Sequence, residues 1–221
     1  MSTRETVLAR IREALTIEAS PHGAVGLPTM ADQRRVMPPV GASEEERLAL
    51  FAKNAGDLRA TFVRVANEAE AWQKLKEAAV TDKWERVLTH KSKLTQPAAE
   101  SIGLPVAYIE QALPKTEQAQ CDVGITECDA LIAQTGTVLV TSRSAGGRAL
   151  SCLPPYHVVL ARREQLVPDM PAAFALLKTK YAGGFPSMIS FITGPSRTGD
   201  IERILVLGAH GPKRLTIFCI G

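Results

Sequence analysis

The stretch Met188-Ile189-Ser190-Phe191-Ile192-Thr193-Gly194-Pro195-Ser196-Arg197-Thr198-Gly199-Asp200-Ile201-Glu202 combines three local patterns. It opens with a mostly apolar, strand-like run and continues through a Gly-Pro turn. From Asp200 to Leu207 the pattern is that of a helix. A strand that leads through a turn into a helix is the repeating unit of α/β proteins. The stretch therefore predicts an α/β fold.

The same alternation extends upstream from this stretch to about residue 60. Strands are predicted at residues 61–65, 86–89, 106–109, 130–133, 138–141, 157–161 and 215–220, with helices from residue 67, at 95–102 and at 170–178. The Thr135-Gly136 pair predicts a turn between neighbouring strands. We therefore expect a mainly parallel sheet flanked by helices, with an antiparallel insertion in the middle.

A helical arm is predicted ahead of the α/β region. Val7, Leu8, Ile11 and Leu15 fall on one face of an amphipathic helix over residues 3–18. The connection that follows is rich in proline and glycine and is expected to be extended or mobile. Ser43 and Glu46 have the spacing of a capping box, which begins a second helix. We expect an arm with its linker over residues 1–58 and an α/β domain over residues 59–221.

Composition and charge exclude several classes of protein. The 221 residues carry a net charge of +3, and 5% of them are aromatic. They provide neither the basic stripe nor the stacking platform of a nucleic-acid-binding protein. The N-terminus lacks the apolar core of a signal peptide, and no apolar run is long enough to span a bilayer. We expect a cytoplasmic protein that does not bind nucleic acid and does not span a membrane.

The four cysteines do not form a metal-binding pattern. Cys121, Cys128, Cys152 and Cys219 include no Cys-x-x-Cys pair, whereas structural zinc and iron–sulfur sites need tighter groups. The chain also lacks a flavin or nicotinamide fingerprint. We therefore expect no metal and no cofactor. Cys121 and Cys128 flank a more polar stretch and leave a metal or redox role open.

An anion site is predicted around the Gly-Pro turn. Gly194, Ser196, Arg197 and Thr198 precede the predicted helix, whose free N–H groups and dipole would favour negative charge. Arg197 adds a guanidinium suited to a carboxylate or phosphate. Ligands of parallel sheets bind at the carboxyl ends of the strands, which favours the loops after Thr193 and Leu139.

Three further groups of residues complete the candidate site. The hydroxyls of Thr135 and Thr137 and the amide of Gly136 either line the pocket or form an ordinary hairpin. Arg148 follows two glycines and lies either on a surface loop or on a lid over the ligand. His210 stands in the last glycine-rich loop, and its role, like that of His157, is either structural or chemical.

Residues 122–221 resemble the lactate-utilization protein C group of the LUD-domain family. The resemblance is carried by these segments: Gly124-Ile125-Thr126, Cys128-Asp129, Ile132 to Thr137, Leu150 to His157, Gly194 to Glu202, and Leu207 to Pro212. It implies the α/β fold of sugar isomerases and coenzyme A-transferases (NagB/RpiA/CoA-transferase-like). It also implies a role beside two iron–sulfur proteins that oxidise L-lactate to pyruvate. The family's pattern usually has alanine at the position of Cys128 and a larger hydrophobic residue at the position of Cys152. The resemblance therefore implies that these two cysteines are packing substitutions.

Two hypotheses follow. In the first, the chain is the cluster-free subunit of the lactate-oxidising system, and it binds a small carboxylate or phosphate or scaffolds its partners. In the second, it is a free-standing enzyme on a small phosphorylated or acyl substrate, which needs an acid, base or nucleophile in the pocket. Asp129, Glu127 and His210 are the candidates for that role, but none belongs to a known catalytic motif. The first hypothesis is preferred, and no catalytic residue is assigned.

Overall fold

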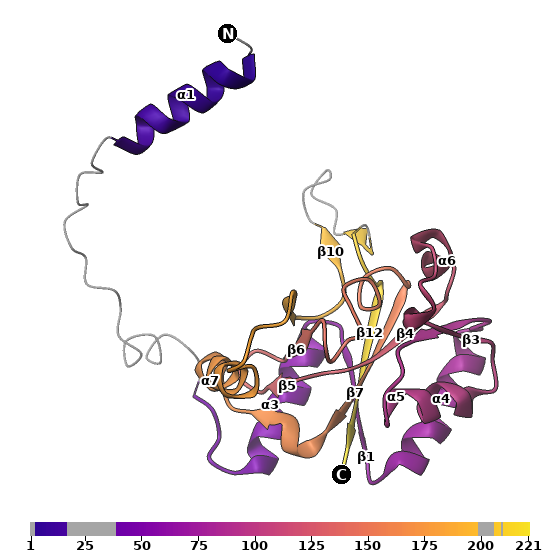
Figure 1. Ribbon diagram of the computed structural model, residues 1–221. Coiled ribbons are helices and arrows are strands. Elements are labelled where there is room, and N and C mark those ends of the chain that lie inside the picture. Colours follow the sequence, from indigo (N-terminus) through magenta and orange to yellow (C-terminus); the bar gives the residue numbers. More distant parts are fainter. Residues whose placement is uncertain (1–2, 17–38, 199–205, 209) are drawn as a thin grey trace. The chain divides into compact units, whose positions relative to one another are not determined.

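The structure is a computed structural model that describes residues 3–16, 39–198, 206–208 and 210–221 (Figure 1). The chain divides into two compact units, residues 1–38 and 39–221. The described part of the first unit is the helix α1 (Thr3–Thr16), which confirms the predicted N-terminal helix. All fourteen of its residues are exposed. The predicted linker lies mostly outside the described residues.

The second unit alternates strands and helices. Its helices are α3 (Glu44–Asp57), α4 (Glu68–Thr81), α5 (Thr95–Ile102), α6 (Lys115–Ala119) and α7 (Met170–Lys180), with 3₁₀ turns η1 (Ile109–Gln111) and η2 (Arg163–Gln165). Its strands are β1 (Thr61–Val65), β2 (Val87–Thr89), β3 (Val106–Tyr108), β4 (Val123–Glu127), β5 (Ala130–Ile132), β6 (Thr137–Thr141), β7 (Tyr156–Arg162), β8 (Leu166–Val167), β9 (Ile189–Ile192), β10 (Arg197–Thr198), β11 (Val206–Leu207) and β12 (Arg214–Ile220).

The main sheet has six strands in the order β1-β12-β7-β4-β2-β3, and every neighbouring pair is parallel. The last strand of the chain, β12, lies between β1 and β7, so that Leu215 pairs with His157 and Thr216 with Thr61. This confirms the predicted mainly parallel sheet. The central strand β4 was not predicted, because Gly124, Thr126 and Glu127 interrupt the apolar pattern of a strand. A Cβ on Gly124 would lie 2.4 Å from the carbonyl oxygen of Leu150, so glycine lets the loop before β7 approach closely.

A second sheet of four strands has the order β8-β5-β6-β9. The β5–β6 and β6–β9 pairs are antiparallel, which confirms the predicted antiparallel insertion. The strand predicted at Met188–Ile192 therefore belongs to this sheet and not to the parallel one. Val206–Leu207, predicted as the end of a helix, instead forms β11, which pairs with β10. The rest of that predicted helix lies outside the described residues.

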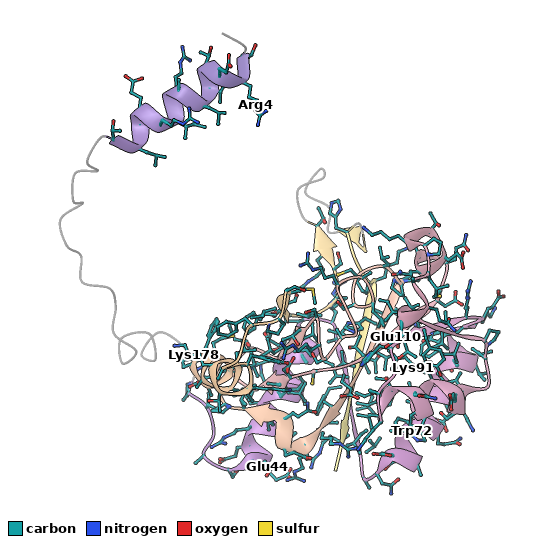
Figure 2. All side chains as sticks on the ribbon, in the orientation of Figure 1. Arg4, Glu44, Trp72, Lys91, Glu110 and Lys178 are labelled. Atoms are coloured by element: carbon teal, nitrogen blue, oxygen red, sulfur yellow. The ribbon has the colours of Figure 1, made fainter. Side chains whose placement is uncertain are left out.

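The main sheet is covered on both faces (Figure 1). Helices α4 and α5 pack on one face around Leu75, Ala98 and Ile125. The second sheet and α3 pack on the other face, and α7 covers the second sheet. Figure 2 shows side chains filling the space between these layers. Because apolar residues alternate along β7 and β12, each strand contributes to both cores.

Helix α3 belongs to the compact α/β unit, which begins at Pro39, although the sequence grouped it with the N-terminal arm. Its predicted capping box is confirmed: Ser43 accepts the Glu46 N–H, and Glu46 accepts the Ser43 N–H. Leu48 and Phe51 on its inner face are fully buried against the sheets. None of the helices in the described part of the chain has the length and apolar character needed to cross a membrane.

Candidate functional site

A cavity of about 260 Å³ lies where β7 and β12 begin, at the side of the main sheet that faces the second sheet. Its walls come from segments that are far apart in the chain: Ser151–Cys152, His157, Ser190–Ser196, His210–Pro212 and Leu215. The cavity thus forms at the amino ends of two parallel strands. The expected position was at the carboxyl ends, but that argument took β9 for a strand of the parallel sheet.

Three of the predicted ligand-binding residues line this cavity. Gly194 and Ser196 come from the loop after β9, and His210 comes from the loop before β12. Arg197 and Thr198 follow in β10 and are not among its lining residues. The guanidinium group that the sequence placed in the anion site therefore belongs to an exposed residue beside the cavity.

The backbone of the Gly194–Ser196 loop is held in place by neighbouring segments. Gly194 has φ +82°, and a Cβ there would lie 2.6 Å from the carbonyl oxygen of Leu58, so the position needs glycine. The Ser196 N–H donates to the Pro212 carbonyl at 2.9 Å. The sequence predicted free N–H groups for an anion here, but the Ser196 N–H already has the Pro212 carbonyl as its acceptor. The side-chain hydroxyl of Ser196 remains as a polar group of this residue, which lines the cavity.

His157 is the most deeply buried polar residue of the cavity, with 1% of its surface exposed. Its Nε2 lies 2.9 Å from the hydroxyl of Thr126 on the neighbouring strand β4. Its Nδ1 has no hydrogen-bond partner among the described residues. Burial lowers the pKa of His157 to about 3, so the ring is neutral at physiological pH. An unpartnered buried nitrogen of this kind costs about 1–3 kcal/mol of stability.

Ser151 and Thr193 add hydroxyls that the sequence did not single out. Ser151 is buried beside His157 in the lining, and its nearest polar contact is the Cys152 sulfur at 3.8 Å. Thr193 lies at the end of β9. A small hydroxyl residue in a loop is too common a signal to mark a site. The packing of the second sheet against the loop before β7 brings these groups together.

The Thr135-Gly136-Thr137 turn does not reach the cavity directly. Gly136, with φ +63°, ends the turn between β5 and β6. Asn54 of α3 donates to two carbonyls of the same turn, at 2.9 and 3.1 Å. Thr135 donates to Thr137, whose hydroxyl lies 2.9 Å from that of Thr193. A chain of hydroxyls therefore connects this hairpin to the wall of the cavity.

Arg148 is exposed, and its guanidinium donates to the carbonyl of Ser187 at 3.0 Å. It is not among the residues that line the cavity. The loop that carries it packs against His90: a Cβ on Gly146 would lie 2.3 Å from the His90 Cβ. The glycines of this loop therefore permit a close approach to another part of the same protein.

Asp129 lies at the start of β5 and is buried among donors. Lys180 and Tyr181 donate to its Oδ1, each at 2.6 Å, and Ser144 donates to its Oδ2 at 2.6 Å. Burial alone would raise the pKa of Asp129, but these three hydrogen bonds outweigh it and hold the pKa below its usual value. The carboxylate is ionised and accepts three hydrogen bonds, so it links the start of β5 to the end of α7.

A second polar cluster lies at the carboxyl ends of β2 and β4. The Ser92 hydroxyl donates to Glu127 and accepts the N–H of Thr95 at 3.0 Å, which caps the start of α5. His90 is 5% exposed, and its Nδ1 has no partner among the described residues. Burial lowers the pKa of His90 against the opposing charges of Glu127 and Glu110. Polar residues directly after a predicted strand were the signal that could have found this cluster.

The cysteines differ in exposure. Cys121, Cys128 and Cys219 are buried, whereas Cys152 is exposed and lies in the wall of the cavity. Burial raises the pKa of the Cys219 thiol to about 11 and also raises the pKa values of the Cys121 and Cys128 thiols. In the described part of the chain, no three His, Cys, Asp or Glu side chains are grouped so that they could hold a metal ion.

A neighbouring cavity of about 350 Å³ shares Cys152, His210 and Gly211 with the first. Lys213 lines this second cavity. Neither cavity has an aspartate or glutamate among its described lining residues. The local charge is therefore neutral to positive, which suits a small anion.

Known proteins share both the sequence and the fold. A lactate utilization protein C of Halalkalibacterium halodurans is 44% identical over 107 residues, which are 48% of this chain and 46% of the relative. Over that match the chain spans less than half the length of the relative. A lactate utilization protein C of Oceanobacillus iheyensis is 28% identical over 194 residues, which cover 81% of this chain and 82% of the relative.

The crystal structure of a DUF162 family protein from Deinococcus radiodurans superimposes with a TM-score of 0.65. The two chains are 24% identical, and the match covers 82% of this chain and 100% of the other. This likeness supports the α/β fold described above. The family model of the LUD domain matches residues 3–220. The chain therefore belongs to the LUD domain family.

Proposed function

We propose that this protein is a component of a lactate-utilization system, that it binds a small carboxylate or phosphate in the cavity between β7, β9 and β12, and that two iron–sulfur partner proteins carry the electrons. The assignment of this chain to a lactate-utilization system is supported by its relatives, which are named lactate utilization protein C. The relation covers the greater part of the chain in the Oceanobacillus iheyensis match.

The composition of the cavity wall is the main support for a small anionic ligand. His210 and Ser196 offer a nitrogen and a hydroxyl, and Lys213 stands in the adjoining cavity. The described wall contains no acidic side chain that would repel a carboxylate. Phe191 and Leu215 supply an apolar surface beside these groups. This combination suits a ligand with one anionic group and a short carbon chain.

The size of the cavity favours a small metabolite. Pockets for drug-sized ligands have volumes of about 300–1,000 Å³, and this one has about 260 Å³. The volume accommodates a three-carbon acid or inorganic phosphate with a few water molecules. A dinucleotide would need a longer groove and a phosphate-binding loop of the kind that the sequence lacks.

The α1 helix supports a second part of the proposal, which is that the chain docks onto its partners. Val7, Leu8, Ile11 and Leu15 fall on one face of α1, and each is exposed by 37–80%. Such an apolar helical face is the usual form in which a helix enters a groove of another protein. We assign the docking role to α1 alone, because the apolar face of α3 is already buried against the sheets.

The experiment is a reconstitution of lactate-dependent dye reduction from the two iron–sulfur partners, with and without this chain. The proposal predicts that full activity needs the chain and that a His210→Ala, Lys213→Ala variant restores at most about a tenth of it. Lys178→Ala is the matched control and should restore full activity, because this exposed lysine on α7 (Figure 2) is not among the lining residues of either cavity. Equal lactate oxidation by the partners alone would contradict the proposal.

One observation favours the alternative, a free-standing enzyme on a small acyl or phosphorylated substrate. The Ser92 hydroxyl donates to Glu127, which is the arrangement of a nucleophile and its base. However, the same hydroxyl already accepts two N–H groups at the start of α5, so both of its lone pairs are engaged. Because both lone pairs of the Ser92 hydroxyl are engaged, we prefer the proposal that the chain binds a ligand as a component of the lactate-utilization system. Hydrolysis of a small ester by the isolated chain, abolished in Ser92→Ala, would reverse that preference.

A further inference from the structure

Large apolar side chains are exposed on one part of the α/β unit. In the described residues of this unit, the exposed large apolar residues are Val80, Phe174, Phe185 and Ile189. Phe174, Phe185 and Ile189 belong to the segment from α7 to β9 and are exposed by 49%, 60% and 36%. We call these three residues the α7–β9 surface. Single exposed apolar residues are ordinary, but several in one place mark an interaction site.

The three residues come from neighbouring elements. Helix α7 contacts β9 through the rings of Phe174 and Phe191, whose centroids are 5.4 Å apart. Because side chains alternate along a strand, Ile189 points to the same side of β9 as Phe191, which is the side that α7 covers. Phe185 lies in the connection between the two elements, shortly before Ile189. The helix, the connection and the strand thus contribute one apolar residue each.

Two arginines lie beside this connection. Arg143 donates to the Gly184 carbonyl at 3.3 Å, and its guanidinium carbon lies 5.1 Å from the centroid of the Tyr181 ring. Arg148 donates to the Ser187 carbonyl at 3.0 Å. Neither a carbonyl nor a ring carries a net charge, so these contacts fix the two guanidinium groups without neutralising them.

Lys178 provides a third cation. It is exposed on α7 (Figure 2). Because it follows Phe174 by one turn of the helix, the two side chains are neighbours on the surface of α7. The acidic residue Asp169 lies at the opposite end of the helix, where its side chain accepts the Ala172 N–H. The end of α7 that leads into the connection is therefore positive.

The two segments that form this surface contain no acidic residue. Residues 137–148 and 170–192 include neither Asp nor Glu. Lys180 forms an ion pair with Asp129, so its charge is already balanced. The whole chain has 26 basic and 23 acidic residues, so a surface without any acid differs from the chain as a whole.

We propose that the α7–β9 surface, together with its three neighbouring cations, binds the headgroup region of a bilayer that contains anionic lipids. Apolar side chains enter such an interface, and the negative surface of the lipids attracts the cations beside them. Phe185 is the most exposed of the three apolar residues, follows two exposed glycines and would enter the interface. The attachment is peripheral and needs no helix that crosses the membrane.

Two observations favour a bilayer over a protein partner. A helix of another protein binds in a groove, and none of the three apolar residues lines either of the cavities described above. Protein interfaces also match charges of opposite sign, whereas the segments here carry one sign. The exposed apolar face of α1 in a second copy is a poor occupant, because the arginines of α1 outnumber its glutamates.

Sedimentation of the full chain with sucrose-loaded vesicles tests the proposal. One set of vesicles contains phosphatidylcholine alone, and the other contains equal parts of phosphatidylcholine and phosphatidylglycerol. At low salt, we expect the chain to bind the mixed vesicles at least about tenfold more tightly than the neutral ones. High salt should weaken binding to the mixed vesicles, because it screens the attraction between the cations and the lipids.

Two matched pairs of variants test the surface itself. Phe185→Ser removes an exposed apolar side chain from the surface, and Val80→Ser removes one from α4, which packs on the other face of the main sheet. Phe185→Ser should weaken binding to the mixed vesicles about tenfold, and Val80→Ser should leave it unchanged. Lys178→Gln should weaken the same binding about fivefold, whereas Lys76→Gln, at an exposed position of α4, should have no effect. Circular dichroism establishes that each variant is folded.

The result does not depend on the proposed function, because the vesicles carry no iron–sulfur protein. Equal binding of the wild-type chain to both sets of vesicles, or to neither, would overturn the proposal. So would unchanged binding in both Phe185→Ser and Lys178→Gln, and loss of binding in a Leu8→Ser, Ile11→Ser variant would then assign the attachment to α1. If the chain binds no vesicle and Phe185→Ser lowers the reconstituted dye reduction, the surface binds a partner protein instead. If Phe185→Ser does not fold, Lys178→Gln and its control decide.

Discussion

Asp129 and His157 are both buried polar residues at the start of a strand, yet their surroundings are opposite. Asp129 accepts three hydrogen bonds of 2.6 Å from side chains of the protein itself. His157 uses one nitrogen and leaves the other without a partner among the described residues. The comparison separates a polar group that the protein satisfies fully enough to stabilise the fold from one that it leaves partly unpaired among the described residues. A carboxylate in a sequence motif is therefore a weaker indication of a ligand-binding site than a buried polar atom without a hydrogen-bond partner.

The largest effect should come from Asp129→Asn. The amide nitrogen would face donors that now converge on a carboxylate, and the charge of Lys180 would lose its partner. We expect the free energy of unfolding to fall by about 2–3 kcal/mol, less than for a fully buried pair because the Lys180 side chain is 48% exposed. Urea denaturation measures this change.

The control for that variant is Lys180→Met, which removes one donor and leaves the carboxylate with two. It should lower the free energy of unfolding by less than Asp129→Asn does. Cys152 is exposed in the cavity wall, and its protection against alkylation by bound L-lactate should be unchanged in both variants. A stable Asp129→Asn protein that no longer binds L-lactate would show that the two residues had been assigned the wrong roles.

Acid should destabilise the protein through His157. The folded pKa is about 3, while the unfolded imidazole titrates near 6.5. As the pH falls below about 6.5, the unfolded chain takes up a proton that the folded chain does not. The free energy of unfolding should then fall by up to about 1.4 kcal/mol per pH unit from this group. His90, whose pKa burial also lowers, acts in the same direction.

Urea denaturation between about pH 7 and pH 5 tests this slope, above the range where most carboxylates titrate. The same series on His157→Phe should show a shallower slope, because one of the titrating groups is gone. Identical slopes in the two proteins would mean that His157 titrates alike in the folded and unfolded states. The ring would then be accessible to water, and the floor of the cavity would not be dry.

The smallest effect on stability should come from His157→Phe at neutral pH. The substitution removes an unpaired nitrogen, which favours folding, and strips the Thr126 hydroxyl of its partner, which opposes it. We expect a net change within about 1 kcal/mol, measured by the same denaturation. A loss as large as that of Asp129→Asn would mean that His157, too, is mainly a structural residue.

Local signals in the sequence were enough to predict many of the elements. The Ser43–Glu46 spacing predicted a helix start, and its capping box is present. A helix was also predicted from residue 67, and there Asn67 accepts the Glu70 N–H. The strand at residues 61–65 and the turn at Gly136 were also predicted correctly. Each of these features depends on residues that are close together in the chain.

The arrangement that forms the cavity could not be predicted in the same way. His157 meets Thr126 only because β7 pairs with β4, and it meets Leu215 only because the last strand inserts between β1 and β7. Strand order of this kind depends on contacts across more than a hundred residues in places. The misassignment of Val206–Leu207 has a more local origin, because pairing with β10, which is near in the chain, overrides a helical pattern.

A crystal structure of the chain with L-lactate is the most direct test of the account. We expect one L-lactate in the cavity, with its carboxylate within hydrogen-bond distance of Ser196 and His210. L-lactate bound instead at the Ser92–Glu127 cluster, or an empty cavity at a concentration that saturates the reconstituted system, would contradict the proposed site.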